Sequence, residues 1–304
     1  MHQASIREAD LERDAPAIVD LVREINPSAV ISIDSWRQRE QAVPARAQAR
    51  GWVAESEGDV AGYAEAWRAF FGTGSRTGFV KVSVAETYRR RGIGSALFET
   101  GSAHVKALDV NSILTNFHEN DAGIAFASEL GFRPVRAEAE AVLDPRAVRE
   151  TPDSTVDLRP VGEVDPRLVH AVDLEATLDM PSTEPIKDIP YDEWEQHVLQ
   201  HPLFTTEGSF VAMVDGVAAA VSLLTFDAET GRAHNMFTGT LRAYRGRGLG
   251  LAVKLASIHW AAARGATMMA THNDETNAPM LAINRRLGYV PAGRRVEWLK
   301  ALGT

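Results

Sequence analysis

Residues 88–94 read Tyr-Arg-Arg-Arg-Gly-Ile-Gly, and residues 244–250, which lie 156 positions later, read Tyr-Arg-Gly-Arg-Gly-Leu-Gly. The segments that precede them also match. Residues 52–62 and residues 210–219 both have the pattern of a strand, a tight acidic-glycine turn and another strand. Because these landmarks recur in the same order at nearly the same spacing, the sequence predicts an internal duplication.

A third landmark supports the duplication and helps to place its boundary. Residues 130–134 read Leu-Gly-Phe-Arg-Pro, and residues 287–291 read Leu-Gly-Tyr-Val-Pro, at an offset of 157. Between the halves, residues 144–153 are polar and contain two prolines, which is typical of a linker. We therefore expect an N-terminal domain at 1–148 and a C-terminal domain at 153–304, a division that the length of 304 residues also favours.

Each half shows the same order of predicted elements. A short strand and helical segments precede the hairpin, and a longer strand follows it at residues 78–84 and 234–241. After the glycine-containing loop come an amphipathic helix, a short strand, a second helix that ends at Leu-Gly-aromatic, and a final strand. The predicted fold class is α+β, with two tandem domains that each have a mixed, mostly antiparallel sheet flanked by helices.

Composition excludes several classes of function. The chain has no cysteine, which excludes disulfides and cysteine nucleophiles, and no apolar run reaches the roughly 18 residues that a membrane span needs. A formal net charge of -9 argues against a nucleic-acid partner and suits a cationic small substrate. We expect a cytoplasmic protein without nucleic-acid or membrane partners, either a monomer, since two joined copies form a pseudo-dimer, or a homodimer.

The repeated loops are predicted to bind an anion. Each follows a strand with β-branched residues and opens a helix, at 93–108 and 249–264, where unpaired amide N–H groups and the helix dipole attract negative charge. Glycines let a pyrophosphate approach the backbone, and arginines add charge-assisted hydrogen bonds. A plain turn before a helix is the alternative. The predicted contacts are Arg89, Arg90, Arg91, Gly92, Ile93 and Gly94 in the first half, and Arg245, Gly246, Arg247, Gly248, Leu249 and Gly250 in the second.

In both halves the loop is followed, at the same distance, by an asparagine, spaced hydrophobic residues and then Leu-Gly-aromatic. The asparagines are Asn120 and Asn277. With these motifs the sequence resembles the GNAT superfamily of acyl-CoA N-acetyltransferases over nearly its whole length, and the arrangement is similar to tandem members such as mycothiol synthase. The resemblance implies acetyl-CoA as the acyl donor, bound at the loops with the two asparagines as further contacts.

A base that deprotonates the substrate amine is expected only in the second half. The resemblance implies a glutamate on the long strand, 14 residues before the first glycine of the loop. Counting back from Gly248 gives His234, whereas counting back from Gly92 gives Gly78. An imidazole titrates near neutral pH, which suits a base. A solvated or core-edge histidine is the alternative, with Asp227 and Glu229, in the turn before the strand, as fallback bases or ordinary turn residues.

The alternation of side chains along the strand predicts that His234 lies on the same face as Met236, Thr238 and Thr240. The resemblance also implies that backbone N–H groups of this strand stabilise the oxyanion and pair with the pantetheine arm. These groups are expected at Thr238, Thr240 and Leu241 in the second half, and at Val82 and Val84 in the first. The alternative is an ordinary ladder of backbone hydrogen bonds.

Many family members place a tyrosine four residues before the glycine of Leu-Gly-Phe, where it protonates the departing thiolate. This sequence has Ala127 and Asn284 at these positions. An amide donates a hydrogen bond but is no proton donor, so we expect Asn284 or water to assist the thiolate. Contact with the cofactor or capping of the helix are alternative roles of Asn284.

The segment 179–207 is a long connection that is expected to shape the acceptor site. The candidates for attracting or facing an amine are Glu184, Asp188, Tyr191, Asp192, Glu193 and Trp194. The alternative is solvated charges and a helix start, with the tryptophan in the core. His197 and His201 have the spacing of metal ligands, but no third ligand is evident, and no metal is expected.

The sequence thus predicts an N-acetyltransferase whose second domain moves an acetyl group from acetyl-CoA to a primary amine of a small molecule by direct attack. The first domain is expected to be non-catalytic, with or without bound acetyl-CoA. Two alternatives stay open. One is a non-catalytic acyl-CoA-binding sensor or scaffold, which the missing tyrosines favour, and the other is acetylation of protein N-termini or lysines.

Overall fold

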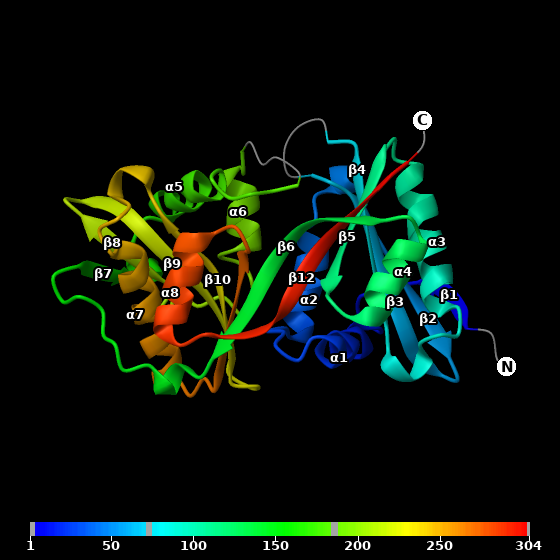
Figure 1. Cartoon of the computed structure of the whole chain (residues 1–304), viewed down its shortest axis with the longest axis horizontal. Helices are drawn as coiled ribbons and strands as arrows, with labels where there is room; N and C mark the ends of the chain where they lie inside the picture. Colours follow the sequence, from blue (N-terminus) through cyan, green and yellow to red (C-terminus); the bar gives the residue numbers. More distant parts are fainter. Residues whose placement is uncertain (1–3, 71–74, 184–187, 303–304) are drawn as a thin grey trace. The chain divides into compact units, whose positions relative to one another are not determined.

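The structure is a computed structural model of the 304-residue chain, and it describes residues 4–70, 75–183 and 188–302 (Figure 1). The chain forms two compact units, and each is assembled from separate segments of the sequence. Unit 1 consists of Met1–Ala137, Thr183–Pro185 and Arg295–Thr304. Unit 2 consists of Glu138–Ser182 and Ile186–Arg294.

Unit 1 has a sheet with helices on both faces. Its elements are β1 (Ser5–Glu8), α1 (Ala15–Ile25), α2 (Ile33–Ala42), η1 (Ala45–Ala47), β2 (Arg50–Ser56), β3 (Asp59–Arg68), β4 (Thr77–Val84), η2 (Glu86–Tyr88), α3 (Ile93–Lys106), β5 (Ser112–His118), α4 (Asp121–Glu129), the start of β6 (Arg133–Leu143) and the end of β12 (Val290–Ala301). The strands pair in the order β1-β2-β3-β4-β5-β12. Among these pairs β4–β5 is parallel and the others are antiparallel.

Unit 2 repeats this arrangement. Its elements are the end of β6, η3 (Pro145–Ala147), β7 (Asp157–Pro160), η4 (Val161–Glu163), α5 (Pro166–Thr177), α6 (Tyr191–His197), β8 (Phe210–Val214), β9 (Val217–Asp227), β10 (Arg232–Thr240), η5 (Arg242–Tyr244), α7 (Leu249–Ala263), β11 (Met268–Asp274), α8 (Ala278–Leu287) and the start of β12. The strands pair in the order β6-β11-β10-β9-β8-β7, with β10–β11 parallel. The predicted α+β class and the mixed, mostly antiparallel sheets are confirmed.

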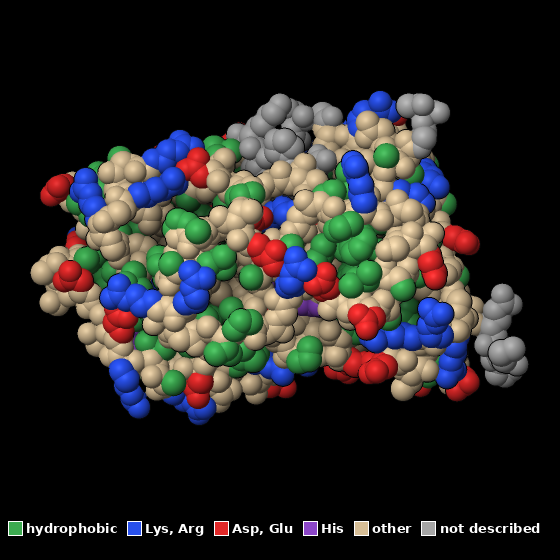
Figure 2. All heavy atoms as spheres, in the orientation of Figure 1, with side chains coloured by type: hydrophobic (Ala, Val, Ile, Leu, Met, Phe, Trp, Pro, Cys, Tyr) green, Lys and Arg blue, Asp and Glu red, His purple; other side chains and the backbone are tan. Residues whose placement is uncertain are grey.

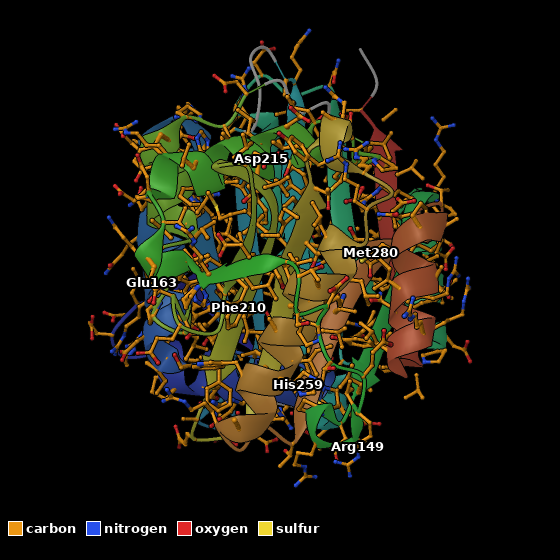
Figure 3. All side chains as sticks on the ribbon, turned by 90° about the vertical axis from the view of Figure 1, so that its left-hand side faces the viewer. Arg149, Glu163, Phe210, Asp215, His259 and Met280 are labelled. Carbon is orange, nitrogen blue, oxygen red and sulfur yellow. The ribbon has the colours of Figure 1, made fainter. Side chains whose placement is uncertain are left out.

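In each unit, helices cover both faces of the sheet, because the apolar side chains of the helices pack on the apolar side chains that each face presents. In unit 1, α1 and α2 pack with Val53 and Tyr63 on one face, while α3 packs with Ala64 and Val80 on the other. In unit 2, α5 and α6 cover one face, and α7 packs on β8 and β9 (Figure 3). Each fully buried large side chain contributes roughly 1.5–3 kcal/mol to such a core.

The last strand of each repeat pairs with a strand of the other repeat. Residues 138–143 of β6 pair with β11 in unit 2, whereas residues 295–301 of β12 pair with β5 in unit 1. The compact units therefore differ from the domains 1–148 and 153–304 that the repeat predicts, and that division stays a prediction about the repeat. Local pattern predicts the strands themselves, but the choice of pairing partner depends on tertiary contacts.

Candidate active site

The second glycine loop connects η5 to α7, and its backbone conformation favours glycine. Gly246 and Gly248 have φ values of 77° and 76°, in the left-handed region that costs other residues roughly 1–2 kcal/mol. The helix begins at Leu249, and no side chain caps it. A Cβ atom at either glycine would meet no atom within 4 Å, so the space beside the loop is open. This geometry suits an anion at the helix N-terminus.

The first loop has the same backbone with one difference. Gly92, before α3, has a φ of 81°, again without a side-chain cap. At the position of Gly246, however, stands Arg90, with a φ of 64°. The first loop therefore keeps the conformation of the second even where a side chain makes it costly.

The arginines of the two loops share some contacts and differ in others. Arg89 and Arg245 each donate from Nε to a backbone carbonyl oxygen, of Val84 and Thr240 respectively, at 3.1 Å. In addition, Nη2 of Arg245 lies 2.6 Å from a carboxylate oxygen of Asp179. Hydrogen bonds from Arg242 and Arg245 lower the pKa of Asp179 to about 2. The predicted phosphate-binding arginine of the second loop is thus held by a carboxylate.

The glycine loops lie where the central strands separate. The parallel pairing of β10 with β11 covers residues 232–235, while β10 continues to Thr240 beside β9. In unit 1 the pairing of β4 with β5 covers residues 77–79, while β4 continues to Val84 beside β3. Backbone groups predicted to bind pantetheine belong to the parts of β10 and β4 beyond the pairing with β11 and β5, or follow them directly. They are those of Thr238, Thr240 and Leu241 in unit 2 and of Val82 and Val84 in unit 1.

The alternation predicted for His234 is wrong because β10 contains a bulge. Asn235 pairs with Leu224 and Phe237 with Leu223, so Met236 is an extra residue in the ladder. The bulge reverses the alternation of the residues that follow. His234 therefore shares its face with Phe237, while Thr238 and Thr240 lie on the opposite face.

Side-chain contacts agree with this assignment. The hydroxyl of Thr238 donates to Oδ1 of Asn235 at 2.9 Å, on the face that α7 covers. His234 pairs with Thr225, which alternates with Leu223 and Val221 in the core beneath α5 and α6. The candidate base thus lies on the face of the sheet opposite to α7.

The counterpart of His234 in unit 1 is a phenylalanine. Gly78 faces α3, since a Cβ atom there would lie 2.8 Å from the side chain of Val105. Because β4 has no bulge, Phe79 occupies the opposite face, and its ring stacks on Trp67 at 5.2 Å. The expectation that the first half lacks a titratable group at this position holds for both residues.

His234 contacts a second histidine that sequence reasoning missed. Nε2 of His234 lies 3.1 Å from Nδ1 of His272 on β11. Nε2 of His272 in turn lies 3.5 Å from a carboxylate oxygen of Glu140 on β6, which is 3% exposed. The only signal in the sequence is that both residues are polar within strand-like segments, and nothing there indicates which strands become neighbours.

The other predicted polar residues have local partners. Oδ1 of Asn120 accepts from the N–H of Gly123, and Oδ1 of Asn277 accepts from the N–H of Met280, so both asparagines cap helices. Asn284 is a buried residue of α8, and its Nδ2 donates to Oδ1 of Asn273 at 2.6 Å. The roles of these asparagines toward a cofactor stay predictions.

The fallback bases belong to a turn. A carboxylate oxygen of Asp227 accepts the N–H of Glu229 at 3.0 Å, and the other accepts the hydroxyl of Thr230 at 2.7 Å. Asp227 is buried. These contacts are those of a residue that stabilises the connection between β9 and β10.

The segment before β8 forms part of the core as well as the surface. Trp194 is buried, and its Nε1 donates to Asp173 at 2.6 Å, so the alternative of a core tryptophan is the one observed. Tyr191 is half-buried and donates to Glu195. Asp188 and Asp192 are exposed, Glu193 is half-buried, and Glu184 lies outside the described residues. His197 and His201 each have a ring nitrogen at hydrogen-bond distance from a backbone group.

Two further features concern the charge of the surface and the character of the helices. On the face drawn in Figure 2, basic and acidic side chains are interspersed with hydrophobic ones in both units. Within residues 4–70, 75–183 and 188–302, no helix combines the length and apolar character that a membrane span requires.

Comparison with known proteins identifies the family. The family model of the acetyltransferase (GNAT) family matches residues 15–132 and 171–289. The chain therefore belongs to this family, with one match in each repeat, and the predicted enzyme class, an acetyltransferase, is confirmed. No curated protein matches the chain.

Solved structures agree on the tandem fold. A tandem GNAT protein from the clavulanic acid biosynthesis pathway is 20% identical, with a TM-score of 0.78 and coverage of 99% of each chain. A GCN5-related N-acetyltransferase from Sphaerobacter thermophilus is 19% identical, with a TM-score of 0.72 and coverage of 98% of this chain and 95% of that one. A putative acetyltransferase from Pyrococcus horikoshii is 13% identical, with a TM-score of 0.63 and coverage of 100% and 91%.

Proposed function

We propose that the chain transfers an acetyl group from acetyl-CoA to a primary amine of a small molecule, by direct attack of the amine in unit 2. The observation that carries this proposal is the position of His234. It stands on β10 immediately before the bulge, beside the point where β10 and β11 separate, and it contacts a second imidazole at 3.1 Å. Unit 1 has Phe79 at the corresponding place.

The residues of the second loop fit a coenzyme A pyrophosphate. The first turn of α7 has no side-chain cap, and the space beside Gly246 and Gly248 is open. Arg245 is fixed beside the loop by its contacts with Thr240 and Asp179. Acetyl-CoA, the acyl donor typical of this family, would supply the acetyl group as a thioester.

Different residues of the chain have different roles in the reaction. His234 accepts the proton that the amine loses as it attacks. The N–H of Leu241 already donates to the carbonyl oxygen of Ala219 at 2.9 Å. The backbone N–H groups that donate to the thioester carbonyl oxygen as it gains negative charge are therefore those of Thr238 and Thr240. A thiol with a pKa near 8.5 is a fair leaving group, so an amide such as Asn284 or a water molecule is sufficient to assist it.

One observation favours a second candidate, a non-catalytic acyl-CoA sensor. The position of the usual tyrosine acid is Ala127 in unit 1 and Asn284 in unit 2, and both residues are buried. A sensor would bind acetyl-CoA without consuming it. The two candidates differ in whether His234 affects turnover.

The test is release of the CoA thiol from acetyl-CoA across a panel of small amines and peptides, with the wild type and His234→Ala. We expect turnover on a small amine and a loss of at least about tenfold in kcat for the variant. His259→Ala is the matched control, because His259 lies on α7 and its Nε2 contacts the carbonyl oxygen of Glu150 (Figure 3).

Three outcomes would contradict the proposal. Turnover that His234→Ala leaves unchanged would remove this residue as the base. Turnover on peptides alone would favour acetylation of protein amines. Binding of acetyl-CoA without turnover on any acceptor would favour the sensor.

A further inference from the structure

Three polar side chains from three neighbouring strands form a line across one face of the unit 2 sheet. His234 lies on β10, His272 on β11 and Glu140 on β6. His234 pairs with Ala270, two residues before His272, and His272 pairs directly with Glu140. Alternation therefore places all three side chains on the same face, and contacts of 3.1 Å and 3.5 Å connect them.

The burial of Glu140 favours one arrangement of the ring protons. A carboxylate that is 3% exposed requires donors, and Nε2 of His272 faces it. With its proton on Nε2, the neutral ring of His272 has an accepting lone pair on Nδ1. His234 then donates from Nε2 to this atom, and its own Nδ1 retains the lone pair that a base needs.

We propose that His272 and Glu140 are positioning residues for His234, and that the three form a proton relay for acyl transfer. This inference rests on the proposed function of unit 2. His234 is the residue that meets the substrate amine, while His272 and Glu140 set its tautomer and ring orientation and receive its displaced proton.

Each proton in the proposed relay has a defined donor and acceptor. The nitrogen lone pair of the amine forms the C–N bond, and the amine proton moves to Nδ1 of His234. The Nε2 proton of His234 passes to Nδ1 of His272, which becomes a cation beside the carboxylate of Glu140. The C–S bond breaks with its electron pair on sulfur, and the proton held by the relay returns to the thiolate or to solvent.

Other charged residues share this face. Arg232 lies two residues before His234, Asp274 lies two residues after His272, and Glu138 pairs with Asp274. Asp274 accepts the N–H of Thr276 at 2.8 Å. The relay thus lies on a face that carries two further carboxylates and one arginine.

Through Glu140, the first repeat contributes a residue to the proposed relay of unit 2. Glu140 belongs to the last strand of the first repeat, and a C-terminal domain cut at residue 153 would lack it. In unit 1, the same register positions hold Phe79, Asn116 and Glu297. Glu297 lies 3.2 Å from Arg136 and accepts the hydroxyl of Thr183, and the residue opposite it on β5 is Asn116 rather than a histidine.

The kinetic test compares Glu140→Gln and Glu140→Asp with the matched control Glu297→Gln. For Glu140→Gln we expect kcat to fall at least about tenfold with an unchanged KM for acetyl-CoA, and the acidic limb of the kcat/KM profile to move to lower pH. Asp should retain more activity than Gln, and Glu297→Gln should leave kcat and the profile unchanged. An unaltered kcat and profile in Glu140→Gln would overturn the relay.

A second measurement does not depend on turnover, so it separates failure of the relay from failure of the proposed function. Long-range ¹H–¹⁵N NMR of the wild type, with His234→Ala and His272→Ala for assignment, reports which ring nitrogens carry protons. In the wild type we expect the ring proton of His272 to lie on Nε2. In Glu140→Gln we expect it to be distributed between Nε2 and Nδ1. A His272 ring protonated on Nδ1 alone in the wild type would overturn the relay even if acetyl transfer is observed.

Discussion

The sheet face beneath α1 and α2 in unit 1 and the face beneath α5 and α6 in unit 2 carry different polar groups. In unit 1, Glu65 lies 2.8 Å from Arg39 and 3.5 Å from Lys81. Burial would raise the pKa of the Glu65 carboxyl, but Arg39 and Lys81 more than offset it, so its pKa lies below the ordinary value. In unit 2, the imidazoles of His234 and His272 occupy this face.

The difference shows how a duplicated fold can separate structure from chemistry. Both units keep the glycine loop, the separating strands and the helix start, since these depend on backbone conformation. The chemistry of the face beneath α1 and α2, or beneath α5 and α6, depends on a few side chains. In unit 1 the carboxylates of this face are neutralised by cations. Substitutions at matched positions of the two units can therefore break or support this contrast.

The largest expected effect concerns a pair of buried positions. In unit 1 they hold Phe98 and Phe132, in edge contact at 5.7 Å, whereas in unit 2 they hold Lys254 and Tyr289, with the ammonium 4.9 Å from the ring centre. Lys254 is fully buried, and this burial lowers its pKa to about 7. An apolar partner for the ring would avoid the cost of burying an amine.

We expect Lys254→Met to raise the free energy of unfolding at pH 7 by on the order of 3 kcal/mol. Between pH 7 and pH 10.5 the unfolded chain binds a proton that the folded protein releases, so wild-type stability rises with pH in this window. Urea denaturation at pH 7 and pH 9.5 measures both effects. The variant should lose this rise, while Phe98→Leu should lower stability without changing the slope; an unchanged slope in Lys254→Met would contradict the assignment.

The next effect concerns the two loops. Gly248→Ala places a side chain at a φ of 76°, and Gly92→Ala does so at 81°, each at a cost of roughly 1–2 kcal/mol. If unit 2 alone is catalytic, Gly248→Ala should raise the KM for acetyl-CoA about tenfold, and Gly92→Ala should leave turnover unchanged. Steady-state kinetics with varied acetyl-CoA measure this, and equal effects of the two variants would show that both loops serve catalysis.

The smallest effect concerns the carboxylate that holds the second loop. Asp179→Asn should change the KM for acetyl-CoA by no more than about fivefold, because exposed ion pairs contribute roughly 0.2–1 kcal/mol. The pKa of Asp179, about 2, keeps it charged throughout the neutral range. The effect should therefore be the same at pH 6 and pH 9 and should shrink in high salt; a change above tenfold would mean that this contact organises the whole loop.

Particular residues show how far sequence reasoning reached into the site. The position of His234 on the long strand and the glycine loops were predicted, because both follow from motifs of a few neighbouring residues. The face of Thr238 was predicted wrongly, because a single extra residue, Met236, reverses the alternation. His272 and Glu140 were missed, since each lies in a strand whose partner is chosen only in the folded sheet.

The amino-acid sequence by itself determined the duplication, the α+β class, the acetyltransferase family and the loop conformations, because local patterns and backbone preferences carry this information. Only the tertiary structure decided the exchange of the last strands, the bulge in β10 and the contacts that join His234, His272 and Glu140. The physical reason is strand pairing. It brings together residues that are far apart in the chain, and its register is set by how the whole core packs.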